Sequence, residues 1–209
     1  MKEQDIKKYF DQMAPDRDKW KKKSRYYYNH LENFISFLAP ENKRVVEIGC
    51  GNGDLLFKLK PSYGLGIDIS DKMIELARQK NSNPKIEFKV GAVENIEGFF
   101  DYVILSDLIG YLPDIEDFFR KLSRVMHSQS KIIITQYSQL WEPLLSLASS
   151  AGLRTPVQIT QNWISLQDIN NFLQLTGFES IKSGKKLLFP KNIPLISKII
   201  NNYLINLWS

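Results

Sequence analysis

The stretch RVVEIGCGNGDLLFKL, residues 44–59, decides the fold of this chain. An apolar run ends in an acid, Glu47, and three alternate glycines follow at once, Gly49, Gly51 and Gly53. Glycine loses more conformational freedom on folding than any other residue. Alternate glycines therefore predict either a tight turn or a ligand bound so close to the backbone that a side chain would collide with it. The stretch as a whole predicts a strand, a glycine loop and a helix.

The alternation of strand and helix continues beyond this stretch. Helical segments at 54–60, 70–80 and 114–126 separate the short apolar runs, which lie at 44–48, 63–69, 85–90, 100–106 and 131–137. This order predicts right-handed βαβ units over a parallel sheet. A hairpin pattern at 178–190, with Ser183-Gly184 at its turn, adds two strands, of which one must be antiparallel. We therefore expect an α/β, Rossmann-like, doubly wound and mostly parallel seven-stranded sheet with one antiparallel strand.

The chain is interpreted as one domain, residues 1–209, with five regions. Ser165 and Asp168 form a capping-box pattern that begins the last helix of the fold, and Gly177 ends it. The regions are an N-terminal helical lid at 1–40, a core at 41–137, a helical insertion after the fifth strand at 138–164, the last helix and hairpin at 165–190, and a C-terminal amphipathic helix at 191–209.

The C-terminal helix has two readings. It either packs on the domain or across a homodimer, or it docks on a membrane surface with Lys191 and Lys198 facing the lipid headgroups. The choice between monomer and homodimer stays open.

Composition narrows the class of protein. With 43% hydrophobic and 24% charged residues, the chain has the composition of an ordinary globular protein, and no apolar run is long enough to span a membrane. The charged N-terminus lacks the apolar centre of a signal peptide, and the single cysteine, Cys50, fits a reducing compartment, so we expect a cytoplasmic protein. The net charge is +5, but the only dense basic run, Lys21–Lys23, is typical of a solvated helix face. We therefore expect no nucleic-acid partner.

The glycine loop suits some ligands better than others. A dinucleotide site needs a small residue where this chain has Asp54, and a phosphate loop needs a Gly-Lys-Ser/Thr ending that is absent. S-adenosylmethionine carries a sulfonium and an ammonium but no phosphate, so the negative charge of Glu47 suits it. Asp68 ends the next strand, where a carboxylate can accept both ribose hydroxyls, and Ile69 can pack on the adenine. A nicotinamide-dependent oxidoreductase is the alternative enzyme.

Four segments together resemble the class I S-adenosylmethionine-dependent methyltransferases that act on small molecules. They are VVEIGCGNGD, GLGIDIS, GAVENI and FDYVILSDLIGYLPD, within residues 43–137. Later segments resemble a bacterial subgroup sometimes found joined to, or near, glycosyltransferase domains. That resemblance implies a small-molecule acceptor, such as a glycan or a lipid-linked sugar, with S-adenosylhomocysteine as the product of the cofactor.

The resemblance also implies cofactor-binding residues. Where the family commonly has an aspartate after the third-motif glycine, this chain has Ala92, so the adenine contact is either made by backbone alone or taken over by Glu94. The implied cofactor site comprises Glu47, Gly49, Cys50, Gly51, Asn52, Gly53, Asp68, Ile69, Ala92, Val93, Glu94 and Ser106.

The chemistry needs alignment and exclusion of water, and a general base only if the acceptor must lose a proton. Candidate bases are Asp107 and His30, whereas His127 has the position of a helix cap. No His/Cys/Asp cluster suggests a metal. A methyltransferase-like module that binds the cofactor without catalysis, and the identity of the acceptor atom, both stay open. We expect the N-terminal lid and the insertion to select the acceptor through Tyr28, Tyr111, Trp141 and Trp163.

Overall fold

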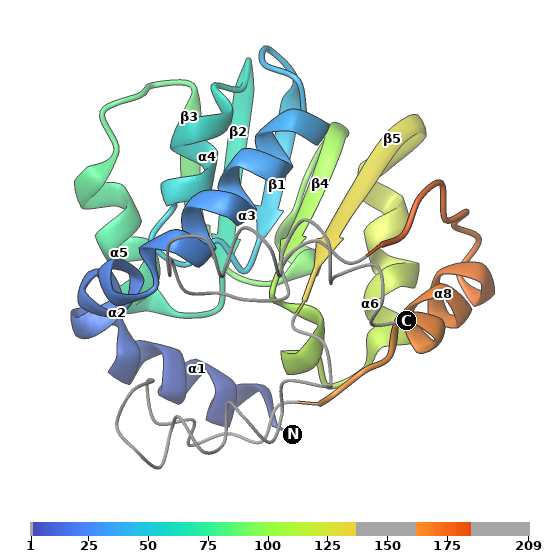
Figure 1. The fold of residues 1–209 in the computed structure, drawn as a ribbon, viewed down its shortest axis with the longest axis horizontal. Helices are drawn as coiled ribbons and strands as arrows, with labels where there is room; N and C mark the ends of the chain where they lie inside the picture. The colour runs from blue at the N-terminus through green and yellow to red at the C-terminus, as the bar shows by residue number, and fades with distance from the viewer. Residues whose placement is uncertain (1, 137–161, 185–209) are drawn as a thin grey trace, which may run out of the picture.

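A computed structural model describes residues 2–136 and 162–184 of the chain (Figure 1). Most of the predicted insertion, the second strand of the predicted hairpin and the C-terminal amphipathic helix therefore lie outside the described residues. The predicted helical N-terminus is present. It consists of α1 (Glu3–Met13), a 3₁₀ turn at Ala14–Asp16, α2 (Arg17–Lys23) and α3 (Arg25–Leu38).

A five-stranded parallel sheet forms the centre of the described structure. Its strands are β1 (Arg44–Ile48), β2 (Tyr63–Asp68), β3 (Ile86–Val90), β4 (Phe100–Ser106) and β5 (Met126–Thr135), in the order β3-β2-β1-β4-β5. All four strand pairings are parallel. The Rossmann-like α/β fold is thus confirmed, but the described part of the sheet has five parallel strands rather than seven with one antiparallel member.

The predicted hairpin is wrong for its first strand. Residues 178–184 form no strand in the structure, and Ile181 is 80% exposed. Phe178 instead packs against α6 (Ile115–Leu122), where its ring lies 6.0 Å from that of Phe119. The segment just after α8 (Leu166–Leu175) therefore packs on helix α6 at Phe178 and does not form the predicted strand.

The helices that follow the strands begin where their caps predict. Ser70 caps α5 (Asp71–Lys80), and Asp114 caps α6. The box between Ser165 and Asp168 begins α8, and Gly177 follows its end with a positive φ of 83°. The glycine loop leads into α4 (Asp54–Leu59).

The start of β5 differs from the prediction. The strand begins at Met126 rather than at residue 131, and the preceding helix ends at Leu122. A bulge between Phe100 and Tyr102 accommodates the extra residues, and the Ser130 hydroxyl donates to the Phe100 carbonyl at 2.6 Å. The segment MHSQS has no apolar alternation, so local pattern does not reveal this part of the strand.

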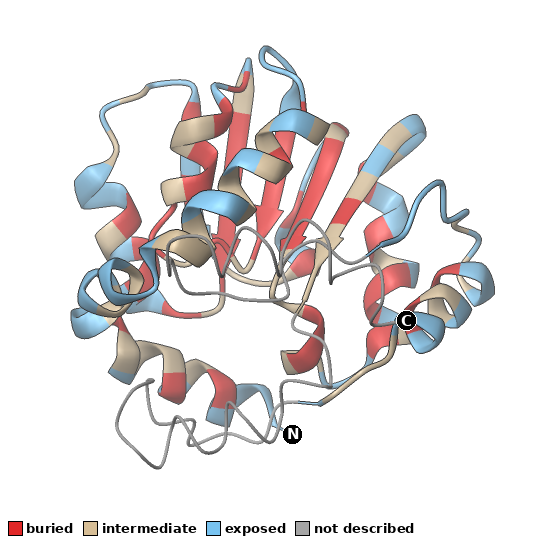
Figure 2. Ribbon diagram, viewed as in Figure 1, coloured by how far each residue is buried: buried red, intermediate tan, exposed pale blue. Residues whose placement is uncertain are grey.

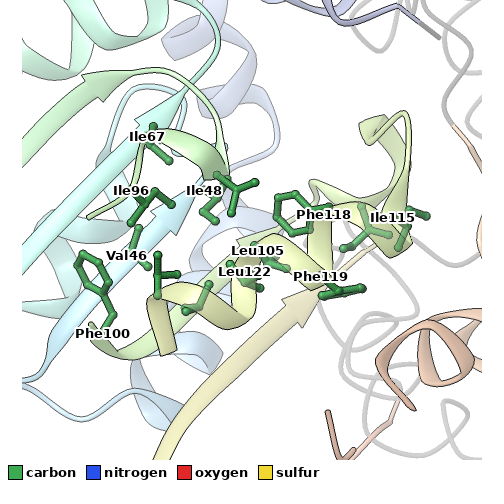
Figure 3. Packing of buried hydrophobic residues seen from close by; sticks show 14 of the residues in the cluster. Val46, Ile48, Ile67, Ile96, Phe100, Leu105, Ile115, Phe118, Phe119 and Leu122 are labelled. Atoms are coloured by element: carbon green, nitrogen blue, oxygen red, sulfur yellow. The ribbon is translucent and has the colours of Figure 1, made fainter. Parts of the chain in front are cut away.

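Apolar clusters cover both faces of the sheet, and the central strands β1, β2 and β4 are largely buried (Figure 2). Helices α6 and α8 cover one face, and Figure 3 shows side chains of α6 packing with those of the strands in this cluster, which includes Val46, Ile67, Phe100, Phe119 and Leu122. Helices α3, α4 and α5 cover the other face, in a cluster that includes Ile35, Val45, Leu56, Ile74 and Ile104.

The strand order reverses between β1 and β4, so a ligand crevice is expected outside the carboxyl ends of these strands. Helix α1 runs past this edge (Figure 1). Within the described residues, no helix has both the length and the apolar character needed to cross a membrane.

Candidate active site

The three glycines share one backbone requirement but differ in what they face. Gly49, Gly51 and Gly53 all have positive φ, at 74°, 52° and 78°. A Cβ at Gly53 would lie 2.4 Å from the Phe88 ring, whereas a Cβ at Gly51 would have its nearest neighbour, the Arg17 Nε atom, at 3.9 Å. Turn geometry thus requires all three glycines, and packing inside the protein adds a second requirement at Gly53.

A cavity of about 450 Å³ lies between the N-terminal helices and the carboxyl edge of the sheet. Most of the residues predicted from the sequence line it. They are Tyr28, Glu47, Gly49, Cys50, Gly51, Asn52, Asp68, Ile69, Ala92, Val93, Glu94, Ser106, Asp107 and Tyr111.

Three of the predicted residues that the structure describes are not brought to this cavity. Gly53 faces Phe88 and is not part of the lining. His30 lies on the exposed side of α3, with its ring 4.5 Å from that of Tyr26, and is also absent from the lining. Trp163 lies outside the lining as well, and Trp141 falls outside the described residues.

Glu47 is a buried acid at the cavity wall. Its side chain is buried, with only 4% of the residue exposed, and its Oε2 atom has no hydrogen-bond partner among the residues that the structure describes. Burial raises the pKa of Glu47 from 4.5 to about 8; the positive charge of Lys21 opposes this shift, and the negative charges of Asp68 and Asp54 add to it. A buried carboxyl with an unpartnered oxygen is suited to a ligand that carries positive charge.

Asp68 joins the ends of β1 and β2. Its Oδ2 accepts from the Gly51 amide and its Oδ1 from the Ser70 amide, each at 2.9 Å. Burial raises the pKa of Asp68, while these two hydrogen bonds and the charge of Arg17 act in the opposite direction. A carboxylate has about four acceptor positions, so hydroxyl groups of a ligand can still bind to it.

The adenine side of the predicted site contains Ala92 and Val93 in the lining, next to Ile69. Glu94 also lines the cavity, but its carboxylate pairs with Lys121 of α6 at 2.6 Å, and this hydrogen bond is the main cause of its lowered pKa. The ion pair directs the Glu94 carboxylate toward α6. A backbone contact to the adenine is therefore the simpler of the two alternatives.

Helix α2 is fastened to the glycine loop by polar contacts, although its lysine run was expected to be solvated. Lys21 lies between Glu32 at 3.0 Å and Asp54 at 2.8 Å, and its side chain is only 15% exposed. Asp18 accepts from the Asn52 amide group at 2.7 Å. The prediction of a solvated face is therefore wrong for Lys21, which long-range contacts bury.

Helix α1 is fastened to the start of α5. Asp11 accepts from the Ser70 hydroxyl at 2.7 Å and from the Lys72 amide at 3.2 Å. The Phe10 ring lies 5.2 Å from that of Tyr111 at an interplanar angle of 74°, so an edge-to-face pair links α1 to the loop after β4. These contacts keep α1 across the cavity.

Asp107 follows β4 with a left-handed backbone, at φ 54°. Its amide donates to the Thr135 carbonyl at 2.9 Å, and its Oδ2 accepts from the Tyr27 hydroxyl of α3 at 2.7 Å. Sequence reasoning did not find roles for Tyr27, Arg17 or Phe10. Helical spacing indicated only an apolar face, and nothing in the local pattern shows which strand end a residue of another element will reach.

Within residues 2–136 and 162–184, no group of three or more His, Cys, Asp or Glu residues is arranged to hold a metal ion.

Known proteins share both sequence and fold with this chain. A ribosomal protein L11 methyltransferase from Thermotoga neapolitana is 33% identical over 109 residues, which cover 49% of this chain and 40% of that protein. The chain thus spans under half the length of this curated relative.

Two solved structures have a similar fold. A SAM-dependent methyltransferase from Thermotoga maritima is 21% identical, with a TM-score of 0.71 and coverage of 88% of this chain and 87% of that one. Magnesium protoporphyrin IX methyltransferase from Synechocystis, solved with bound SAH, is 20% identical, with a TM-score of 0.68 and coverage of 88% and 92%. At this level of identity the likeness concerns the fold.

The sequence model of one family matches the region that contains the sheet and the glycine loop. The match extends over residues 40–177, and the family is described as a methyltransferase domain. This match agrees with the cofactor predicted from the sequence and confirms S-adenosylmethionine in that role. The chain belongs to the methyltransferase-domain family.

Proposed function

We propose that this protein is an S-adenosylmethionine-dependent methyltransferase that acts on a small-molecule acceptor. The observation that carries the proposal is the meeting of the glycine loop, the buried Glu47 and the strand-end Asp68 around one cavity at the point where the strand order reverses.

The cavity fits the chemical groups of this cofactor. The unpartnered oxygen of Glu47, judged among the described residues, suits the cationic methionine end, and Asp68 retains acceptor positions for the ribose hydroxyls. Ile69, Ala92 and Val93 provide an apolar surface for the adenine. Each of these groups of the cofactor would thus meet a side chain of matching polarity.

Arg17 adds a candidate that sequence reasoning did not provide. It lines the cavity, and its Nε atom lies 3.9 Å from the position of a Cβ at Gly51. The Arg17 Nη1 atom also donates a hydrogen bond to the Tyr28 hydroxyl at 3.2 Å. Because a guanidinium pairs well with carboxylates, Arg17 is the residue we assign to the carboxylate of the methionine end.

When bound, the cofactor supplies an already activated methyl group. The chain then has to bind it, align the acceptor in line with the methyl carbon, and exclude water. Helices α1 and α2 would contribute to the last task, because their polar contacts to α5 and to the glycine loop close one side of the cavity.

The nicotinamide alternative is disfavoured by charge. A dinucleotide diphosphate is held at the start of the helix after the glycine loop, where this protein has Asp54 and, on the cavity wall, Glu47. The Asp54 carboxylate would repel a diphosphate there, and the buried Glu47 offers it no positive charge.

The narrower features of the proposal rest on the sequence. They comprise a single domain over 1–209, acceptor selection by the lid and the insertion, a glycan or lipid-linked sugar as acceptor, and a C-terminal helix that packs in a monomer or homodimer or docks on a membrane. An association with glycosyltransferases likewise stays a prediction.

Calorimetric titration with S-adenosylhomocysteine, with NADH as the competing ligand, tests the proposal. We expect micromolar binding of S-adenosylhomocysteine alone, and a loss of about tenfold or more in Asp68→Ala, because each tenfold change corresponds to about 1.4 kcal/mol, the worth of one hydrogen bond to a charged group. Asp101→Ala serves as the control, since Asp101 lies at the opposite end of β4. A preference for NADH would contradict the proposal. Binding without transfer of a labelled methyl group to any acceptor would favour the non-catalytic module.

A further inference from the structure

The cavity has a charge opposite to that of the whole protein. The chain carries a net charge of +5, yet among the described residues nine acidic and three cationic side chains line the cavity, and all of the acids except the protonated Glu47 are expected to be charged at neutral pH. The cationic residues are Arg17, Lys21 and Lys121, and the acids are Glu3, Glu32, Glu47, Asp54, Asp68, Glu94, Asp107, Asp114 and Asp117.

The few cations of the lining are already engaged by some of these acids. Lys21 pairs with Glu32 and Asp54, and Lys121 pairs with Glu94 at 2.6 Å and with Asp117. The lining therefore remains strongly negative after these pairs are counted.

S-adenosylmethionine accounts for only part of this charge. Its sulfonium, ammonium and carboxylate sum to one positive charge. The buried Oε2 atom of Glu47, which has no partner within the described part of the chain, is suited to meet that charge. Asp107 follows a different strand, β4, and also lines the cavity. A second ligand, the methyl acceptor, could therefore contact it.

The Asp107 carboxylate is held in one orientation. Its Oδ2 accepts from the Tyr27 hydroxyl at 2.7 Å, and its backbone amide is tied to Thr135 of β5 at 2.9 Å. These two bonds come from different elements, α3 and β5, so they fix both the backbone and the side chain of Asp107.

Aromatic rings surround the same space. Tyr9, Phe10, Tyr28, Tyr111 and Phe118 line the cavity. Aromatic faces attract cations, as the Tyr28 ring already does for Lys21, whose Nζ lies 5.1 Å from the ring centroid. Carboxylates combined with aromatic rings favour a positively charged organic ligand over a neutral or anionic one.

We propose that the acceptor is an amine, bound with its nitrogen beside Asp107 while Tyr27 positions that carboxylate. The inference rests on the proposed methyltransferase function and narrows its substrate class. It excludes an anionic lipid-diphosphate acceptor but accommodates an amino sugar.

The transfer balances as follows. The bound ammonium first gives a proton to the Asp107 carboxylate, from which it passes to water. The lone pair of the neutral amine then forms the N–C bond to the methyl carbon, while the C–S bond breaks and its electron pair stays on sulfur. Positive charge thus moves from sulfur to nitrogen, where a carboxylate stabilises it.

Three ligands of nearly equal shape test the inference on protein saturated with S-adenosylhomocysteine: phenethylamine, phenethyl alcohol and phenylacetate. We expect calorimetry to show that the amine binds at least tenfold more tightly than the alcohol, and that phenylacetate does not bind. Asp107→Asn should remove the preference for the amine without changing the affinity for the alcohol, and Tyr27→Phe should reduce that preference several-fold. Glu116→Gln, an exposed acid of α6 outside the cavity lining, should leave all three affinities unchanged.

The outcomes separate the two proposals. If S-adenosylhomocysteine does not bind, the proposed function fails before the acceptor is tested. If it binds but the amine shows no advantage over the alcohol and the carboxylate, or no detectable binding, the amine inference is overturned. If Tyr27→Phe weakens amine and alcohol equally, the positioning role of Tyr27 is overturned. Should Asp107→Asn lose affinity for S-adenosylhomocysteine, the comparison of the three ligands on the unsubstituted protein decides the matter.

Discussion

Gly53 shows how a glycine in a ligand-binding type of loop can be required by the protein itself. Its φ of 78° favours glycine, and the Phe88 ring fills the space where a side chain would begin. Gly51 shares the left-handed conformation, but an added Cβ there would have only an ordinary contact, with the Arg17 Nε atom at 3.9 Å. The two positions therefore separate the cost of backbone strain from the cost of overpacking.

We expect Gly53→Ala to lower the free energy of unfolding by about 2–5 kcal/mol, the sum of a left-handed alanine and an overpacked side chain. Gly51→Ala should lower the free energy of unfolding by only about 1–2 kcal/mol, since it introduces the strain of a left-handed alanine without overpacking. Urea denaturation measures both values. Gly184→Ala is the control, because no described atom lies within 4 Å of a Cβ added at Gly184. Equal losses of stability in Gly53→Ala and Gly51→Ala would show that the contact with Phe88 does not contribute.

The raised pKa of the buried Glu47 predicts that cofactor binding is linked to proton release. Its pKa is raised to about 8 by burial, so at neutral pH the unliganded protein holds a proton there. This raised pKa contributes to folding stability fully below the ordinary value of 4.5, and the contribution is lost as the pH rises through 8. A cationic ligand favours the carboxylate and releases the proton.

Below pH 8 the affinity for S-adenosylmethionine, which carries one net positive charge, should therefore rise with pH, by at most about tenfold per unit, and should level off above it. Calorimetry at pH 7 in two buffers of different ionisation enthalpy measures the released proton. Glu47→Gln should release none from this site. If the heat of binding to the unsubstituted protein is the same in both buffers, no proton is released and the linkage is disproved.

At the scale of elements, ion pairs and hydrogen bonds fasten the N-terminal helices to the body of the fold. Lys21 of α2 reaches both Glu32 of α3 and Asp54 of α4, and Asp18 binds Asn52 of the glycine loop. The elements joined here lie before and after β1, so the contacts connect the lid to the loop that it covers.

Lys21→Met should destabilise the fold by about 1–3 kcal/mol, because it removes the mostly buried cation that lies between Glu32 and Asp54. Each carboxylate then keeps only a longer ion pair, Glu32 with Lys58 and Asp54 with Lys80, both at 3.5 Å.

The same substitution should also weaken cofactor binding, since the Lys21 charge is what favours the ionised form of Glu47. Thermal unfolding and calorimetry check the two effects. Lys60→Met, which removes an exposed pair with Glu41, should change neither; a similar loss in both variants would contradict the role of burial.

At the scale of the whole molecule, strand order decides where the chemistry is placed. The carboxyl ends of β1, β2 and β4 bring Glu47, Asp68 and Asp107 to one cavity. Neighbouring parallel strands bury their apolar side chains on both faces of the sheet, so polar strand ends are the parts left to meet a ligand. The acids gather there even though the chain as a whole is basic.

The sequence by itself determined the parallel α/β fold, the order of the elements, their caps and the strand-end residues that line the cavity, such as Glu47, Asp68 and Asp107. Those features depend on local signals: apolar periodicity, capping side chains such as Ser70 and Asp114, and glycines at positive φ. The strand at residues 126–130 and the absence of a strand at 178–184 were missed, because bulges and packing against a helix leave no periodic pattern.

Only the tertiary structure decided which distant side chains meet. It brought Tyr27 to Asp107, 80 residues away, buried Lys21 between two acids, turned Gly53 toward Phe88 and left His30 exposed. The physical reason is that such contacts are fixed by how helices cross the sheet edge, and the stabilising energy comes from partners far along the chain. Local spacing can place a residue on a helix face, but it cannot show which strand end that face will cover.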